Sequence, residues 1–324
     1  MRKLKKYIKI KSHVALIFLA LLTATSGLSG YFLAGGSGKV AGSAVKATSE
    51  IEIEKSSKPE LQFYVMSFCP YGNQIENVIR PVFDLIGDKA DLKPQYIFDK
   101  VEGDLATFCQ GRSPDPSMCQ QFIDNGQFQG TVAECSALIQ EQVANCKDEK
   151  QYIKIDNNYY TALHGRIEAN QQIREICAWN LADNQKVWWD FVGNVNTNCT
   201  STDADTCWQE QAKTAGLDTD KITDCFNNQA RDIIEAEIAL TTKNNVSASP
   251  TLLLNGVEFP PQTAYTQDGT GALKINDTVI KQADFRTPEG LKQAVCSVFS
   301  RKPGDCKTTL ETSQDTAAPS AGGC

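Results

Sequence analysis

One cysteine of this chain stands where its thiol could act as a nucleophile. Cys69 follows an apolar, aromatic run and precedes Pro70, a residue that suits the first position of a helix. Unpaired N–H groups and the helix dipole at such a junction stabilise negative charge and lower the pKa of a thiol. Because the thiolate is the attacking species in disulfide exchange, the sequence predicts an exposed, catalytic Cys69. The alternative is that Cys69 is one more bridged cysteine.

A second proline-bearing segment has the features of a substrate-positioning loop. Ser249-Pro250 precedes an apolar run and the dipeptide Asn255-Gly256, a strong signal for a β-hairpin. A cis Ser249–Pro250 bond would expose the main chain of Ser249 to an incoming peptide. We therefore predict that this bond is cis and lies against Cys69; the alternative is a trans proline at a strand start. Further candidates for substrate contact are Pro70 and Tyr71.

The other cysteines indicate an oxidising compartment. The chain has 12 cysteines, which in an exported protein point to a framework of disulfides. Close spacing permits local bridges within four pairs but cannot prove connectivity: Cys109 and Cys119, Cys135 and Cys146, Cys199 and Cys207, Cys296 and Cys306. If Cys69 and Cys324 are set apart, ten cysteines remain, enough for five bridges, although all twelve could equally form six structural ones.

Composition excludes two classes of partner. The net charge is -7, and no basic stretch occurs beyond the N-terminus, so we expect no nucleic acid partner. His13 and His164 are the only histidines, which excludes a His-rich metal site. None of the four cysteine pairs has Cys-x-x-Cys spacing, so structural zinc is a weak alternative. We expect neither a metal nor a cofactor.

The N-terminus has the pattern of an export signal. Residues 1–12 are basic, and residues 13–34 form an apolar run about as long as a membrane-spanning helix requires. The positive flank keeps the N-terminus in the cytoplasm, so a signal anchor here would hold the rest of the chain outside it. Residues 35–58, rich in Gly, Ser, Ala and Lys, are predicted to be a flexible linker. The alternative is cleavage within residues 42–47 and secretion.

The elements around Cys69 predict an α/β domain over residues 59–300. Leu61–Phe68 and Leu92–Phe98 have the composition of buried strands, and the segment between them has an apolar stripe at helical spacing. These three segments should form a βαβ unit with parallel strands.

After this unit, residues of about 100–245 form a predicted helical, cysteine-rich insert. Its clearest helices are 132–146, 167–181, 206–215 and 221–242. The hairpin at Asn255-Gly256 follows, and then a last helix with Thr287 as its cap. Residues 301–324 are predicted to be a disordered tail that carries Cys324.

The two proline-bearing motifs together resemble one family. Phe63-Tyr-Val-Met-Ser-Phe-Cys69-Pro70-Tyr71-Gly72 resembles the active-site turn of DsbA-like thioredoxin-fold proteins, and Ser249-Pro250-Thr-Leu-Leu-Leu-Asn-Gly256 resembles their cis-proline loop. The resemblance covers roughly residues 59–300. It implies a thioredoxin-like α/β fold with a helical insert. It also implies thiol-disulfide oxidoreductase activity on cysteine-containing exported proteins, with a small thiol or a redox protein as partner.

A weaker resemblance surrounds His164. The segment His164-Gly165-Arg-Ile-Glu168, followed by Cys177, is similar to the signature of the gamma-interferon-inducible lysosomal thiol reductase family, whose first two positions and middle cysteine are absent here. We infer a structural role for this segment. His164 is a candidate for tuning the pKa of Cys69, although a helix-start residue with a local hydrogen bond is the simpler interpretation.

Gly72 departs from both families, which have a second cysteine there. A Cys-x-x-Gly site needs another thiol to release a bound client. That thiol could be a small molecule, the client's own second cysteine, or Cys324 of the tail as an internal resolving thiol. The competing hypothesis is a catalytically silent thioredoxin-like module that binds or organises envelope proteins.

Overall fold

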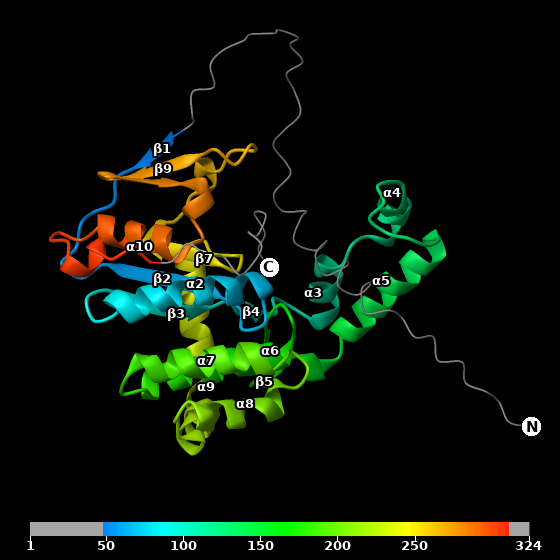
Figure 1. Ribbon diagram of the computed structural model, residues 1–324. Coiled ribbons are helices and arrows are strands. Elements are labelled where there is room, and N and C mark those ends of the chain that lie inside the picture. The colour runs from blue at the N-terminus through cyan, green and yellow to red at the C-terminus, as the bar shows by residue number, and fades with distance from the viewer. Residues whose placement is uncertain (1–47, 311–323) are drawn as a thin grey trace, which may run out of the picture. The chain divides into compact units, whose positions relative to one another are not determined.

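The computed structural model describes residues 48–310 and residue 324 (Figure 1). The predicted basic tail, signal anchor and first part of the linker, residues 1–47, lie outside the described residues. Among the described helices, none has the length and apolar character that crossing a bilayer requires. The described chain forms two compact units, a smaller one of residues 101–151 and a larger one of the remaining residues.

The larger unit is built on a four-stranded mixed sheet in the order β3-β2-β7-β8. Its strands are β2 (Glu60–Val65), β3 (Asp91–Tyr96), β7 (Thr251–Leu254) and β8 (Val257–Glu258). Strands β2 and β3 are parallel and are joined by α2 (Pro70–Ile86), whereas β7 pairs antiparallel with β2. A βαβ unit followed by an antiparallel hairpin and a helix is the thioredoxin-like arrangement that the sequence predicted.

Apolar patterning explains why these segments pack together. Leu61, Phe63 and Val65 of β2 are fully buried, and α2 turns its predicted stripe inward. The buried stripe consists of Ile75, Ile79, Val82 and Ile86. The hairpin turns at Asn255 and Gly256, which have φ values of 48° and 81°, as a two-residue turn of type I′ requires. The last helix, α10 (Pro288–Ser297), begins at the predicted cap Thr287 and packs against α2.

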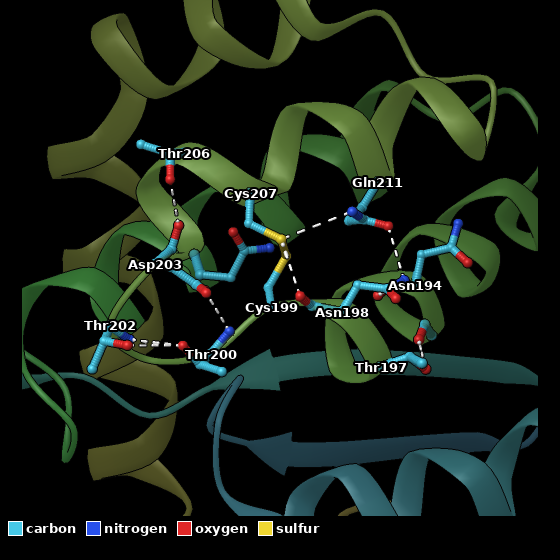
Figure 2. The surroundings of a disulfide bond; sticks show 12 residues. Asn194, Thr197, Asn198, Cys199, Thr200, Thr202, Asp203, Thr206, Cys207 and Gln211 are labelled. Carbon is cyan, nitrogen blue, oxygen red and sulfur yellow. Dashed lines mark hydrogen bonds between the residues drawn. A yellow bond between two sulfur atoms is a disulfide. The ribbon is translucent and has the colours of Figure 1, made fainter.

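Four helices of the predicted insert belong to the larger unit. They are α6 (Arg166–Leu181), α7 (Gln185–Asn198), α8 (Ala204–Thr214) and α9 (Thr219–Lys243). Cys177 on α6 is bridged to Cys225 on α9. Figure 2 shows the Cys199–Cys207 bridge, which joins the end of α7 to α8. This local bridge is one of the four that the spacing permitted.

Two small sheets were not predicted. Strand β1 (Thr48–Ile51) pairs in parallel with β9 (Ala272–Ile275), which also pairs with β10 (Thr278–Lys281). The predicted flexible linker over 35–58 is therefore wrong for residues 48–58, because a strand forms there and Ile53 is buried. Strands β4 (Asp99–Lys100), β5 (Ile153–Ile155) and β6 (Asn158–Thr161) form the second sheet, so the segment 100–245 is not purely helical.

The smaller unit contains three helices and two disulfides. The helices are α3 (Leu105–Arg112), α4 (Cys119–Asp124) and α5 (Val132–Cys146). The bridges are Cys109–Cys146 and Cys119–Cys135. The local bridges that the spacing permitted do not form here. The physical reason is that α5 contacts both α4 and α3, so that the first cysteine meets the last and the inner two meet each other.

The end of the described chain is more ordered than predicted. Residues 304–307 form a short 3₁₀ helix, and Cys306 is bridged to Cys296, the second local pair that forms as the spacing permitted. The ammonium of Lys292 also donates a hydrogen bond to the carbonyl of Thr308. The prediction of a disordered tail from residue 301 is therefore wrong for residues 301–310. Further short 3₁₀ helices lie at 116–118, 149–151, 262–264 and 282–284.

Candidate active site

Cys69 caps the N-terminus of α2. Its Sγ accepts a hydrogen bond from the main-chain N–H of Gly72 at 3.4 Å, so the sulfur lies among the unpaired donors of the first turn. In this structure Cys69 is bridged to Cys324 and is fully buried. The prediction that Cys69 is exposed is therefore wrong for this disulfide state. Cys69 packs with Cys324 and neighbouring side chains in one apolar cluster.

The other ten cysteines of the chain form five further bridges, and the described residues include no free cysteine. This is the count that the cysteine parity allowed with Cys69 and Cys324 set apart.

Ser249 and Cys324 pair through their main chains. The N–H of Cys324 donates to the carbonyl of Ser249 at 2.8 Å, and the N–H of Ser249 donates to the carbonyl of Cys324 at 3.2 Å. This reciprocal pair is the local pattern of an antiparallel bridge. The Ser249–Pro250 bond is cis, and Cys69 Sγ lies 3.5 Å from the carbonyl oxygen of Ser249. The prediction that this bond is cis and lies against Cys69 is confirmed.

The remaining predicted contact residues surround this pair. Pro70 is exposed, and Tyr71 is half-buried in the apolar cluster that contains Cys69 and Cys324. Pro250 lines a cavity of about 370 Å³ on the side of the hairpin. Apolar and polar side chains share its wall, among them Ile75, Asn245, Phe259, Tyr265 and Arg286.

A buried carboxylate on α6 holds the turn before Cys69. Glu168 accepts hydrogen bonds from the main-chain N–H groups of Phe68 and His164, each at 2.9 Å. Its Oε1 also lies 2.8 Å from Nδ1 of His164. Burial lowers the pKa of His164, but the contact with Glu168 outweighs burial, so the net shift of this pKa is upward. His164 thus faces Glu168, which contacts the residue preceding Cys69.

A second carboxyl group, further along α6, reaches the same turn. Glu175 accepts from the hydroxyl of Ser67 at 2.8 Å and from the side-chain amide of Gln171 at 2.9 Å. Burial raises the pKa of Glu175 to about 7, and burial raises that of Glu76 on α2 to about 8. Glu175 also repels the charged form of Glu76. These carboxyl groups can remain buried because each one has a hydrogen-bond partner.

Sequence reasoning missed the role of Glu168 and Glu175 at this site. The two residues are seven apart on one predicted helix, which is the spacing of one face over two turns. That spacing predicts a shared face, but only the packing of α6 shows that this face is buried and meets the turn at Ser67 and Phe68.

Comparison with known proteins finds a thioredoxin-like match over part of the chain. A family model for the vacuolar sorting receptor thioredoxin-like domain matches residues 120–265, less than half of the chain. The matched stretch contains Ser249 and Pro250 but not Cys69. Among curated proteins, none has significant sequence similarity to the chain.

Several solved structures of disulfide oxidoreductases are similar to this chain at low identity. DsbA from Mycobacterium tuberculosis is 14% identical with a TM-score of 0.38, covering 82% of this chain and 96% of that one. DsbG from the same organism is 14% identical with a TM-score of 0.36, covering 80% and 89%. A putative protein-disulfide isomerase from Pseudomonas syringae is 8% identical with a TM-score of 0.36, covering 66% and 91%. Identities of this size transfer no residue roles to this chain.

Proposed function

We propose that this thioredoxin-like chain is a thiol-disulfide oxidoreductase that acts on cysteine-containing proteins outside the cytoplasm, with Cys69 as its nucleophile. The observation that carries the proposal is the bridge from Cys69 to Cys324, whose main chain pairs on both sides with Ser249. A cysteine held in this way mimics a client cysteine in a mixed disulfide. Main-chain pairing also tolerates varied client sequences, because it makes no demand on side chains.

The first chemical step is attack by the Cys69 thiolate on a client disulfide. A bond forms between Cys69 Sγ and one client sulfur, and the other client sulfur leaves as a thiolate. The N–H of Gly72, which contacts Sγ, would stabilise the thiolate before attack. Pro70, Tyr71 and Pro250 would contact the client on either side of Ser249, and the cavity beside Pro250 would receive a client side chain.

The second step needs another thiol, and Cys324 is the internal candidate. Its thiolate would attack Cys69 Sγ of the mixed disulfide, the bond from Cys69 to the client would break, and the client sulfur would leave as a thiolate. The client disulfide is then reduced by two electrons, and the enzyme dithiol is oxidised to the Cys69–Cys324 disulfide. A small thiol or a dithiol protein resets the enzyme by reducing this bridge.

Location outside the cytoplasm fits the cysteine content. Five bridges besides Cys69–Cys324 would be reduced by cytosolic thiols but persist in an oxidising compartment. The signal anchor predicted at residues 13–34 would keep the domain at the membrane surface. His164 would tune the pKa of Cys69 through Glu168, which accepts a hydrogen bond from the turn that holds Cys69.

The test uses two single-cysteine variants and a matched control. Cys69→Ser should abolish reduction of a disulfide-bonded client protein, because no nucleophile remains. Cys324→Ser should still form client mixed disulfides but should release them more slowly. The control is the double variant Cys199→Ser, Cys207→Ser, which removes the local bridge between α7 and α8 and should leave the release rate unchanged.

Mixed disulfides are trapped with acid and identified by mass spectrometry. Client reduction by Cys69→Ser at the rate of the unchanged chain would refute the assignment of the nucleophile. Release that depends only on added small thiol, and equally in Cys324→Ser, would refute Cys324 as the resolving thiol while leaving Cys69 in place.

A further inference from the structure

Gly72 occupies the position of a second active-site cysteine, and neighbouring atoms leave no room for a side chain there. A Cβ atom built on Gly72 would lie 2.8 Å from Ser249 Oγ, 3.3 Å from the Met66 carbonyl oxygen and 3.5 Å from Val65 Cβ. Real Cβ atoms essentially never approach another heavy atom within 3.0 Å. Gly72 lies in the first turn of α2 and not in the left-handed region, so its backbone conformation does not require glycine. Space requires it.

The atom that fills this space is held in place. Ser249 is fully buried, and its Oγ accepts a hydrogen bond from the main-chain N–H of Met66 at 3.1 Å. Turning the hydroxyl away from Gly72 would leave a buried N–H group without its acceptor, which is costly. A side chain at position 72 would therefore collide with the Ser249 hydroxyl, and the hydrogen bond from Met66 opposes any movement of that hydroxyl.

We infer that the Ser249 hydroxyl is a specificity-determining group that excludes a resolving thiol from position 72. Release of a client from Cys69 then requires a thiol from outside the first turn of α2. This inference rests on the proposed function. One residue then has two roles: its side chain closes the local route, and its main chain pairs with Cys324. The Ser249 hydroxyl acts through Gly72, so in this side-chain role Ser249 is a positioning residue.

The inference predicts which substitution opens the local route. In Gly72→Cys alone, the new Cβ and the Ser249 hydroxyl would occupy the same space. In Gly72→Cys, Ser249→Ala the hydroxyl is absent, and the thiolate introduced at position 72 can attack Cys69 Sγ. The bond from Cys69 to the client breaks, the client sulfur leaves as a thiolate, and a disulfide forms between Cys69 and the introduced cysteine. No co-reactant is needed for this single turnover.

The experiment measures release from a preformed mixed disulfide in chains that all carry Cys324→Ser. We expect Gly72→Cys, Ser249→Ala to release the client at least about tenfold faster than Gly72→Cys alone, the factor that one buried hydrogen bond supplies. Ser249→Ala in a chain that keeps Gly72 is the matched control and should not release a client that has no second cysteine. Peptide mapping of the double variant should find Cys69 bridged to the cysteine introduced at position 72.

A second measurement, of thermal stability, tests the inference even if the Gly72→Cys variants do not fold. Gly72→Ala should lower the thermal unfolding midpoint, and the lowering should be smaller when Ser249→Ala is the parent chain. Equal release by Gly72→Cys with and without Ser249→Ala would overturn the inference, as would a Gly72→Ala chain with an unchanged midpoint. Client reduction that persists in Cys69→Ser would instead refute the proposed function itself, so the two failures are distinguishable.

Discussion

Replacing Glu76 by glutamine should change how the stability of the domain depends on pH. Glu76 is 3% exposed, and one of its oxygens accepts a hydrogen bond from Asn196 at 2.6 Å. Burial and, to a smaller extent, the charge of Glu175 raise its pKa, the bond from Asn196 lowers it, and the net result is a rise from 4.5 to about 8. Glutamine keeps an oxygen that can accept the bond from Asn196 but has no proton to lose.

The direction of the effect follows from the two pKa values. Between about pH 4.5 and pH 8, the carboxyl group ionises in the unfolded chain but keeps its proton in the folded one. The folded state therefore binds more protons, and stability falls as pH rises through this window. The rise in the pKa of Glu76 from 4.5 to about 8 on folding corresponds to a loss of stability on the order of 4 kcal/mol by pH 8.

Urea denaturation followed by circular dichroism, at pH values from 5 to 8.5, measures this loss. Glu76→Gln should resemble the unchanged chain near pH 5 and exceed its stability increasingly toward pH 8. The control is Glu210→Gln, at an exposed position of α8, which should keep the pH dependence of the unchanged chain. Parallel stability curves for Glu76→Gln and the unchanged chain would refute the reasoning.

Three further outcomes are expected. Glu168→Gln should lower the free energy of unfolding by about 1–3 kcal/mol and slow mixed-disulfide formation, because the amide group has one acceptor oxygen for the two main-chain N–H groups that Glu168 binds. An unchanged alkylation rate of reduced Cys69 would contradict this. Gly193→Ala should stabilise α7 by about 0.5–1 kcal/mol in thermal unfolding, since no atom stands within 4 Å of the added methyl group. The pair Cys119→Ser, Cys135→Ser should cost about 3 kcal/mol and make residues 101–151 protease-sensitive, which limited proteolysis would detect.

Local signals account for the parts of the fold that the sequence predicted. Pro70 after a buried strand marks the start of α2, and Asn255-Gly256 marks the hairpin, because each conformation depends on one or two residues. Strand β4 has two residues and β1 has four, and both pair with segments far away in the sequence. Short strands of this kind are defined by their partners, so their own residues carry little signal.

The candidate site divides in the same way. Cys69, Ser249 and Pro250 were found because a cysteine at a helix start and a serine-proline pair before a hairpin are local patterns. The fit between Gly72 and Ser249 and the burial of Glu175 depend on tertiary packing. The signal for α7 was present, since Trp188, Trp189, Val192 and Val195 follow helical spacing, but it was not among the helices that we singled out.

The small sheet β4-β6-β5 holds the two ends of the segment 101–151 close together in the larger unit. Lys100, the last residue of β4, and Ile153, the first of β5, both lie opposite Tyr160 of β6, one on each side. Two strand spacings of about 4.8 Å each therefore separate the points where residues 101–151 leave the larger unit and return to it. A linker of a few glycines can span this distance. Residues 101–151 thus have the attachment geometry of a removable cassette, and a chain in which a glycine linker replaces them should keep the Cys69 site and fold without two of the six bridges.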